Sequence, residues 1–446
     1  MKKSRNSYEY DYVQVEKEFG IVFDRSRKIS QFGGLSPLIA FLKKGHFRER
    51  LTAEFGSEKA RTMLQLLLGI VAGADRMIGA ARAGQDPIIR SYLGNPVGEA
   101  QLARDFKAFT KVELERLHEW VTSIAILELV RDIPREEALV FDIDATSVER
   151  FGEQAGVEHG YIDKNVIEAC YQYQFFRLHN LNTFLYGTIR AGSTHSQNGI
   201  CGYLERFLPA FEKRWKTVWR MDSGYFNERA FDIFSENDAT FYVKAPMSDS
   251  RQTAAASPSL VWHTDPKDPD TQYASRNTYT AKGTLWREIY KRSRIRAVQL
   301  SLIESVQYRY ACLATNDLLI EERAAFEFYN GRANIENNLR ELKHDYALGS
   351  IVTEGFDAND AITQVTLLAY LLMQHFKRSL LPPEMLKRKL STLRWEVFNI
   401  PGRLLSAARK KFVRIYNIFH DEKFYARLLY KLKHLRSWVL APPQTI

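Results

Sequence analysis

The first third of the chain alternates apolar and polar positions with the period of a helix. Apolar residues recur every three or four positions in three segments, at 36–44, 57–84 and 111–132. Ser57 and Gly84 are the residue types that start and end helices. Residues 85–109 place turn residues between short periodic pieces. This pattern fits a helix-turn-helix reader and fits a plain helical bundle equally well.

The pattern changes at Ala138, where short apolar runs rich in β-branched and aromatic residues begin. Five runs predict strands, the fourth of them running into a turn: 139–148, 167–176, 182–192, 217–224 and 239–246. Helical periodicity separates the later runs, at 198–215, where Pro209 predicts a turn or kink, and at 227–238. The order of three strands, helix, strand, helix, strand predicts a mixed α/β core.

The core pattern is interrupted after residue 246. Residues 247–307 begin with a polar loop and a Pro- and Asp-rich stretch and continue with alternating segments, which predicts a β-rich insertion returning to the core near Tyr308. From about 358 to 440 the pattern is helical, broken at LLPPE and NIPG. We therefore expect five regions: helical 1–135, core 136–246, insertion 247–307, remainder of the core 308–375 and a basic helical C-terminal region 376–446.

Positive charge is concentrated near the C-terminal end. The chain carries 63 Lys and Arg against 53 Asp and Glu, a net charge of +10, which favours an acidic partner. Residues 375–446 hold 16 Lys and Arg against 4 Asp and Glu, that is +12, so the rest nets −2. Aromatic residues interleave with this charge, a combination typical of nucleic-acid contacts. A basic amphipathic helical pair packed on its own core gives the same pattern.

Composition narrows the class of protein. A chain of 446 residues with 45% hydrophobic and 13% aromatic residues is long and apolar enough for about two to four folded domains. Cys170, Cys201 and Cys312 are far apart and form no CxxC pair, so we expect reduced thiols. The sequence has no 18-residue apolar run and its start has no signal-peptide pattern, which predicts a cytoplasmic protein without a membrane contact.

Three aspartates occupy positions where charge is unexpected. Strand alternation puts Asp142 and Asp144 on one face of the apolar run 139–148. Carboxylates in so apolar a strand are costly unless they are paired or bind a metal. Asp222 ends the strand at 217–224, and ligands bind at such strand ends in α/β sheets. A turn-capping Asp144 and an Asx-turn at Asp222 are the structural alternatives.

The stretch YNGRANIENNLRELK, residues 329–343, predicts a helix with an unusual polar face. At about 100° per residue, four side chains fall within about 60° of one another: Tyr329, Arg332, Glu336 and Lys343. An apolar stripe runs beside them, formed by Ile335, Leu339 and Leu342. An amphipathic surface helix with ordinary solvated charges gives the same helical wheel.

Two strand aspartates and this helical glutamate, Asp144, Asp222 and Glu336, form an all-oxygen set of the kind that hard cations prefer. Two divalent ions about 3.5–4 Å apart can activate a water and stabilise a leaving oxygen in phosphodiester chemistry. The spacings are 222 − 144 = 78 and 336 − 222 = 114 residues. The longer second gap accommodates the predicted insertion.

These residues carry a resemblance to a known family. The order strand Asp, strand Asp, helix Glu resembles the RNase H-like core of DDE transposases and retroviral integrases. The signature Tyr-x2-Arg-x3-Glu-x6-Lys is matched in full, and it resembles one branch of cut-and-paste transposases from bacterial insertion sequences: Tyr329, Arg332, Glu336 and Lys343. The stretch GIVAGADRMIGAARAGQDPIIR is similar to the helical N-terminal region of the DDE group-one members of that branch. The likeness runs from about residue 30 to 375.

The resemblance implies a fold and a set of roles. The fold is α/β, with an RNase H-like mixed sheet flanked by helices, interrupted by a β-rich insertion, and with helical N-terminal and C-terminal regions, the first for DNA binding or dimerisation. Asp144, Asp222 and Glu336 would be the catalytic residues and would bind two Mg²⁺ ions, for which Mn²⁺ can substitute. The DID motif offers two acids where the family needs one, so the role is carried to Asp144 and Asp142 is a further candidate ligand.

The remaining signature residues would bind phosphate or DNA: Tyr329, Arg332 and Lys343. In the insertion, Trp286 or Trp262 would stack a flipped base, unless each simply packs in the core.

The implied activity is that of a DNA transposase. It would cut at element ends, free 3′-hydroxyls and join them to target DNA, with the terminal inverted repeats and the target as DNA partners. We expect a homodimer at least on DNA, in the cytoplasm at the nucleoid. An RNase H-like nuclease that only hydrolyses and an inactive, domesticated DNA-binding protein are the alternatives. The intact set of three acids argues against the second alternative.

Overall fold

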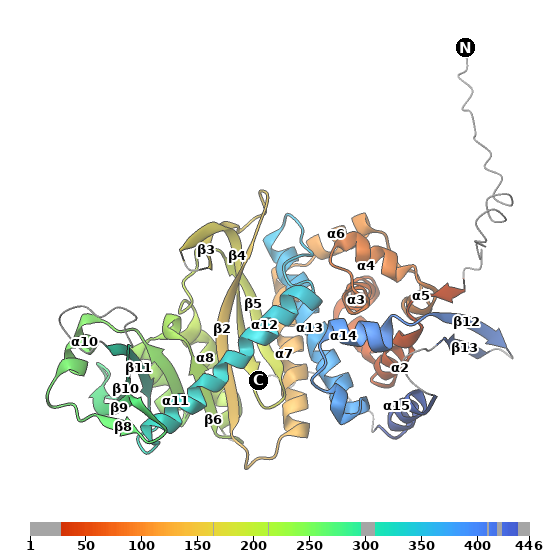
Figure 1. The fold of residues 1–446 in the computed structure, drawn as a ribbon. Helices are drawn as coiled ribbons and strands as arrows, with labels where there is room; N and C mark the ends of the chain where they lie inside the picture. Colours follow the sequence, from red (N-terminus) through yellow and green to blue (C-terminus); the bar gives the residue numbers. More distant parts are fainter. Residues whose placement is uncertain are drawn as a thin grey trace, which may run out of the picture.

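A computed structural model describes residues 28–435 apart from 164, 213, 296–307, 408–409 and 417–421. Three parts follow one another across the molecule (Figure 1). The strands of the insertion lie at one end and the central sheet in the middle. The helical lobe at the other end contains both the N-terminal helices and the C-terminal segment.

Six helices form the N-terminal part of this lobe: α2 (Ser36–Lys44), α3 (Phe47–Ala72), α4 (Met77–Gly84), α5 (Pro87–Leu93), α6 (Glu99–Lys107) and α7 (Lys111–Asp132). The periodic segment at 57–84 is two helices, because Gly73 adopts a left-handed conformation with φ 109° and ends α3. The axes of α3 and α4 differ by 99°. No single described helix is long and apolar enough to cross a membrane, although this bent pair reaches that length and composition together.

The central sheet confirms the predicted mixed α/β core. Its five core strands are β2 (Leu139–Glu149), β4 (Val166–Leu178), β5 (Thr183–Ala191), β6 (Thr217–Met221) and β7 (Thr240–Ala245). They follow the order β5-β4-β2-β6-β7, in which β4 is antiparallel to β5 and β2, while β2, β6 and β7 run parallel. This is the RNase H-like order, with the first strand at the centre. A strand that the sequence pattern did not predict, β3 (Glu158–Asp163), pairs with β4.

Helices cover both faces of this sheet. On the apolar face of β2, the Phe141 ring stacks on Trp219 of β6 at 4.3 Å between centroids and contacts Phe211 of α8 (Ile200–Glu212). The helix α9 (Glu228–Glu236) joins β6 to β7. The long helix α13 (Phe356–Leu380) packs on β5, α3 and α7 and is buried along most of its length. It therefore joins the sheet to the N-terminal helices in one core.

The insertion is β-rich, as predicted, but it extends the core sheet. After α10 (Asp249–Ala256), the strands β8 (His263–Asp265), β9 (Asp268–Tyr279) and β10 (Leu285–Arg294) pair in series. The next strand, β11 (Tyr308–Thr315), pairs with β10 on one side and β7 on the other. One ten-stranded sheet thus runs from the core into the insertion. Sequence periodicity shows which residues share a face of a strand, but it does not show which strand lies next to it. The continuity of the sheet was therefore not predicted.

The chain then crosses the sheet and returns to the helical lobe. The predicted helix at 329–343 is two helices, α11 (Glu322–Asn330) and α12 (Asn334–Asp345), joined by a 3-10 turn at Gly331–Ala333. After α13, a short helix α14 (Leu390–Leu393) runs into a π turn at Arg394–Phe398. The helix α15 (Glu422–His434) is the last described element and packs on α2 and α13.

The expectation of an all-helical C-terminal region is wrong at 402–415. Here β12 (Gly402–Ala407) and β13 (Lys410–Ile415) form an antiparallel hairpin, and β12 also pairs with β1 (Ile29–Ser30). The pair GRLLSA and KKFVRI alternates with a period of two, which suits a strand with one covered face. The close approach of Gly402 and Gly33, where a side chain on either would collide with the other backbone, fixes the hairpin against the N-terminal lobe.

Candidate active site

Asp144 lies on the middle strand of the core, on the face that α12 crosses. The residue is only 9% exposed, and its Oδ1 accepts a hydrogen bond from the Ala145 amide at 3.0 Å. The guanidinium of Arg332 places Nη1 3.2 Å from Asp144 Oδ2. Burial raises the pKa of Asp144 to about 6, opposed by Arg332 and assisted by the charges of Asp222 and Glu336. Asp222 and Glu336 therefore both act on Asp144 electrostatically.

Asp222 is the first residue after β6, the parallel neighbour of β2. It caps the 3-10 turn Ser223–Tyr225, and its Oδ1 accepts a hydrogen bond from the Gly224 amide at 2.9 Å. The Asx-type turn considered from the sequence is therefore present. The same carboxylate raises the pKa of Asp144, so Asp222 holds the turn and also acts on Asp144.

Two of the signature residues of the helical segment, Arg332 and Lys343, contact β2. Tyr329 is 9% exposed at the end of α11, and its pKa is raised by burial against an opposing effect of Arg332. Burial by itself lowers the pKa of Arg332, but Asp144, Tyr329 and Asp222 together outweigh burial, so the pKa is raised overall. Farther along, the Lys343 ammonium donates to the Ser147 carbonyl of β2 at 2.8 Å. Glu336, in the first turn of α12, is exposed.

Asp142 is not part of this open site. It shares the face of Asp144, as strand alternation predicts, but its side chain is fully buried. Its Oδ2 accepts from Arg177 Nη1 at 2.8 Å, and its Oδ1 accepts from Arg220 Nε at 2.7 Å. The strand register sets Asp142 directly between these two arginines. Because both carboxylate oxygens are occupied by guanidinium groups, the candidate role of Asp142 as a metal ligand is corrected to a structural one.

Trp286 does not offer a stacking surface for a base. It is 2% exposed, and its ring lies 5.9 Å from Phe226 and 5.2 Å from Phe231, between centroids. The candidate DNA-binding role is therefore corrected to core packing, the alternative noted from the sequence. Trp262 is half-buried, and the Arg292 guanidinium lies over its ring at 4.2 Å.

Arg177 and Arg220 were not recognised from the sequence. They belong to β4 and β6, 35 and 78 residues from Asp142. The sequence indicated only that a buried carboxylate requires a partner. It did not identify that partner, because a sequence does not specify strand register. Arg220 Nη1 also donates to the Phe328 carbonyl at 2.8 Å. The pair therefore connects the centre of the sheet to the turn that carries Tyr329 and Arg332.

A divalent cation fits the donor chemistry of the three acids, because carboxylate oxygens are what hard cations prefer. Within the described part of the chain, however, no group of three or more His, Cys, Asp or Glu side chains is close enough together to hold a metal ion. The positive charge beside Asp144 is the Arg332 guanidinium. Cation binding therefore requires the side chains of Asp144, Asp222 and Glu336 to converge further.

The raised pKa of Asp144 leads to a prediction about stability. An acid whose pKa rises on folding stabilises the native state below its unfolded pKa, near 4, and this contribution is lost as pH rises to about 6. At pH 7.5 without metal, Asp144→Asn should raise the free energy of unfolding by roughly 1–3 kcal/mol. The gain should vanish near pH 4. Urea unfolding in a chelator at both pH values measures it.

The matched control is Asp249→Asn, at an exposed position in the first turn of α10. It should change the unfolding free energy by less than about 0.5 kcal/mol at either pH. A stability loss in Asp144→Asn at pH 7.5 would mean that its carboxylate is well compensated and carries no electrostatic strain.

Comparison with known protein families identifies one family. The family model described as transposase DDE domain group 1 matches residues 38–437. No curated protein matches the sequence. Among solved structures, the piggyBac transposase synaptic complex with hairpin DNA is similar, with 11% identity and a TM-score of 0.36. That match covers 71% of this chain and 66% of the piggyBac chain, slightly under two thirds of its length.

Proposed function

The chain belongs to the transposase DDE domain group 1 family, and from this premise we propose that it cuts DNA at the ends of a mobile element and joins them to target DNA. The observation that carries the proposal is the placement of Asp144 and Asp222 at neighbouring positions of two parallel strands, with Glu336 on the helix α12 that crosses this sheet. Such an arrangement is expected where negative phosphates and positive ions must be held together.

Asp144, Asp222 and Glu336 would hold the divalent cations, Mg²⁺ or Mn²⁺. When bound, the cations supply Lewis-acid polarisation of the phosphodiester and charge for the leaving oxygen. The residues of the chain prepare the site for this charge. Burial holds Asp144 in a low-dielectric environment, the turn at Ser223–Tyr225 fixes one oxygen of Asp222, and α12 carries Glu336 beside them.

Arg332 is suited to a phosphate in the same site. Its Nη1 is buried and donates no hydrogen bond within the described residues, although it lies 3.2 Å from Asp144. A buried donor that lacks a hydrogen bond is costly, and a phosphate oxygen would satisfy it. We propose that Arg332 balances the acids before DNA binds and holds a phosphate afterwards, with Tyr329 and Lys343 on either side of it along the helical segment.

The proposed partners are the terminal inverted repeats of the element and target DNA, bound by a homodimer in the cytoplasm at the nucleoid. The net charge of +10 supports an affinity for a polyanion. The family supports DNA as that polyanion, since its members are transposases.

The proposal is tested with DNA containing the inverted repeats that flank the gene. Purified protein, this DNA and Mg²⁺ are incubated with a target plasmid, and nicked and joined products are separated on gels. Joined products support transposition. Nicks without joining would favour the hydrolytic nuclease, and DNA binding without either product would favour the inactive DNA-binding protein.

The phosphate role of Arg332 gives a separate prediction. Arg332→Lys should lower cleavage by about 10- to 100-fold and change DNA affinity less than about threefold, because a lysine cannot reproduce a two-pronged guanidinium contact. Lys343→Ala should impair joining of pre-cut ends. The assay uses uncut and pre-cut ends in parallel.

Arg340→Lys is the matched control, since Arg340 is an exposed arginine on the same helix α12. It should cleave and join as the wild type does. Full activity of both Arg332→Lys and Lys343→Ala would show that these cations only pair with neighbouring acids, and the phosphate role would be abandoned.

A further inference from the structure

The three-stranded sheet β1-β12-β13 projects from the outer end of the helical lobe (Figure 1), and one of its faces carries mostly exposed side chains. Strand alternation and register place five residues on this face, which we call the ribbon face: Ile29, Arg403, Leu405, Phe412 and Arg414. Both arginines are exposed, and Ile29 and Phe412 are 44% and 48% exposed. The residue after β13, Tyr416, follows the same alternation and is 48% exposed.

The opposite face fixes the ribbon to the helical lobe. Val413 packs against the main core, and Ser30 is buried and donates from Oγ to Asp86 Oδ1 at 2.8 Å. Asp86 also caps α5 by accepting from the Ile88 amide at 2.9 Å. The ribbon is thus held from beneath by apolar packing and by a capped helix, and its outer side chains are not needed for that attachment.

Two like charges meet on the ribbon face. Arg403 and Arg414 are directly opposite each other in the register of β12 and β13, and neither has a carboxylate partner among the described residues. Like charges directly opposite on adjacent strands are destabilising. In the free protein this arrangement costs stability, and a bound polyanion would remove the cost.

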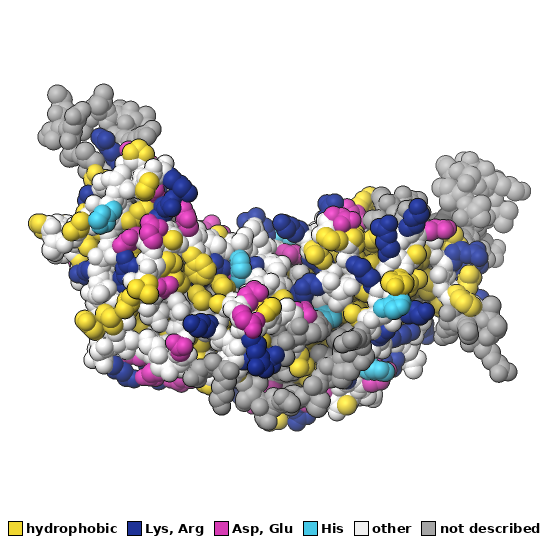
Figure 2. Space-filling model, turned by 90° about the horizontal axis from the view of Figure 1, so that it is seen from below, with side chains coloured by type: hydrophobic (Ala, Val, Ile, Leu, Met, Phe, Trp, Pro, Cys, Tyr) yellow, Lys and Arg dark blue, Asp and Glu magenta, His cyan; other side chains and the backbone are white. Residues whose placement is uncertain are grey.

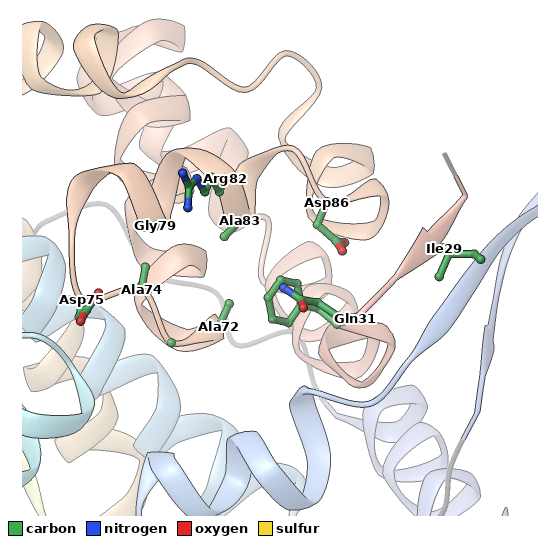
Figure 3. Close-up of a pocket in the computed structure, with 11 residues that line it drawn as sticks. Ile29, Gln31, Ala72, Ala74, Asp75, Gly79, Arg82, Ala83 and Asp86 are labelled. Atoms are coloured by element: carbon green, nitrogen blue, oxygen red, sulfur yellow. The ribbon is translucent and has the colours of Figure 1, made fainter. Parts of the chain in front are cut away.

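A recess next to the ribbon face marks where a polyanion is not expected to bind. A recess of about 530 Å³ lies between β1 and the turn from α3 to α4, lined by Ile29, Gln31, Asp75, Arg82 and Asp86 among others (Figure 3). Two carboxylates in this recess make it unfavourable for phosphate. A polyanion would therefore lie along the ribbon face and not in the recess.

The charge of the C-terminal region and the family of the protein together indicate which polyanion the ribbon face binds. Residues 375–446, which include two of the three strands, carry a net charge of +12. Figure 2 shows Lys and Arg side chains, together with hydrophobic ones, over the lobe at the right of the view. Duplex DNA presents rows of phosphates that exposed arginines can neutralise. An acidic protein would match the charge, but the family makes DNA the expected partner.

We propose that the ribbon face is a contact for the phosphate backbone of duplex DNA, separate from the acids of the catalytic sheet. This proposal rests on the proposed function, which makes DNA the substrate. Arg403 and Arg414 would each neutralise a phosphate, and Phe412, two residues from Arg414 on the same face, would pack against the sugar backbone beside them. The first and last parts of the described chain would then contribute together to one DNA-binding surface.

The test measures binding of a 30-base-pair duplex of arbitrary sequence without metal, as a function of salt. Arg403→Gln with Arg414→Gln should weaken binding about tenfold at 0.1 M salt and make the slope of log K against log salt shallower by about 1.8, which corresponds to two phosphates. Arg403→Lys with Arg414→Lys should keep the wild-type slope. Arg206→Gln with Arg229→Gln removes equal charge from α8 and α9, where each arginine pairs with a glutamate, and should also leave the slope unchanged.

An unchanged slope in the Gln variant, with wild-type thermal unfolding, would overturn the ribbon proposal and leave the catalytic proposal in place. If Phe412→Ser disrupts a dimer while the Gln variant binds DNA normally, the face is an interface between copies and the DNA proposal is wrong. If the wild type itself fails to bind duplex DNA, the proposed function fails, and the ribbon proposal fails with it.

Discussion

Replacing Asp144 or Asp222 with Asn, or Glu336 with Gln, is expected to lower DNA cleavage by at least about a thousandfold, while DNA affinity changes less than about threefold. Each substitution removes a charge from the proposed set of catalytic acids, and none removes a cation from the residues proposed to bind phosphate. The experiment measures cleavage of end-containing DNA in Mg²⁺ and, in a chelator, binding of the same DNA.

Glu327→Gln is the matched control for this prediction. Glu327 is a surface acid of α11, 61% exposed in its side chain and paired with Arg323, so cleavage should stay near wild type. A cleavage rate near wild type in any one of the three site variants would remove that residue from the catalytic set. An active Asp144→Asn together with an inactive but stably folded Asp142→Asn would reverse the choice between the two strand acids.

Asp142→Ala is expected to cost about 3–5 kcal/mol of unfolding free energy, because it leaves two buried guanidinium groups without their shared carboxylate. Arg177 and Arg220 are 4% and 3% exposed, so water cannot replace the lost partner. Urea unfolding followed by circular dichroism measures this loss. Glu354→Gln, which breaks the exposed pair with Lys107, should leave the unfolding free energy close to that of the wild type.

Cleavage should also fall in Asp142→Ala, even at temperatures where the variant is folded. Arg220 donates to the Phe328 carbonyl next to Tyr329, so a freed Arg220 no longer fixes the turn that carries Arg332. A variant with wild-type stability would contradict the buried ion group. A destabilised variant with wild-type cleavage when folded would limit Asp142 to stability and exclude a positioning effect.

The central sheet could be predicted because its strands have distinct, strongly apolar patterns. The run at 139–148 and the four later ones each became a strand, and the position of Asp222 after β6 followed from the turn residues behind it. Parallel pairing of β2 and β6 then places Asp144 and Asp222 at neighbouring positions. The position of Glu336 was predicted from the four-residue signature. The 3-10 turn at Gly331–Ala333 divides the predicted helix in two, but α12 still crosses the sheet.

The unpredicted features all depend on contacts between distant segments. Periodicity shows that Asp142 faces the same side as Asp144, but register decides that Arg177 and Arg220 flank it. The exposure of Trp286 depends on Phe226 and Phe231, some 60 residues earlier in the chain. The hairpin at 402–415 is basic and short, and it is stabilised as a sheet through β1, a partner more than 370 residues away.

The pairing of β1 with β12 has a consequence for how the protein is made. During translation, residues 29–30 and the carbonyl groups at the end of α3 are synthesised long before the residues with which they pair. Arg394 donates to the carbonyls of Val71 and Ile70 at 2.9 and 2.6 Å, and β12 follows it. The N-terminal lobe therefore closes only after the whole catalytic sheet has been synthesised. A chain whose translation stops within that sheet would lack the residues that complete the N-terminal lobe. Early termination should therefore give fragments that proteases degrade, and no truncated protein that competes with the full-length chain for DNA.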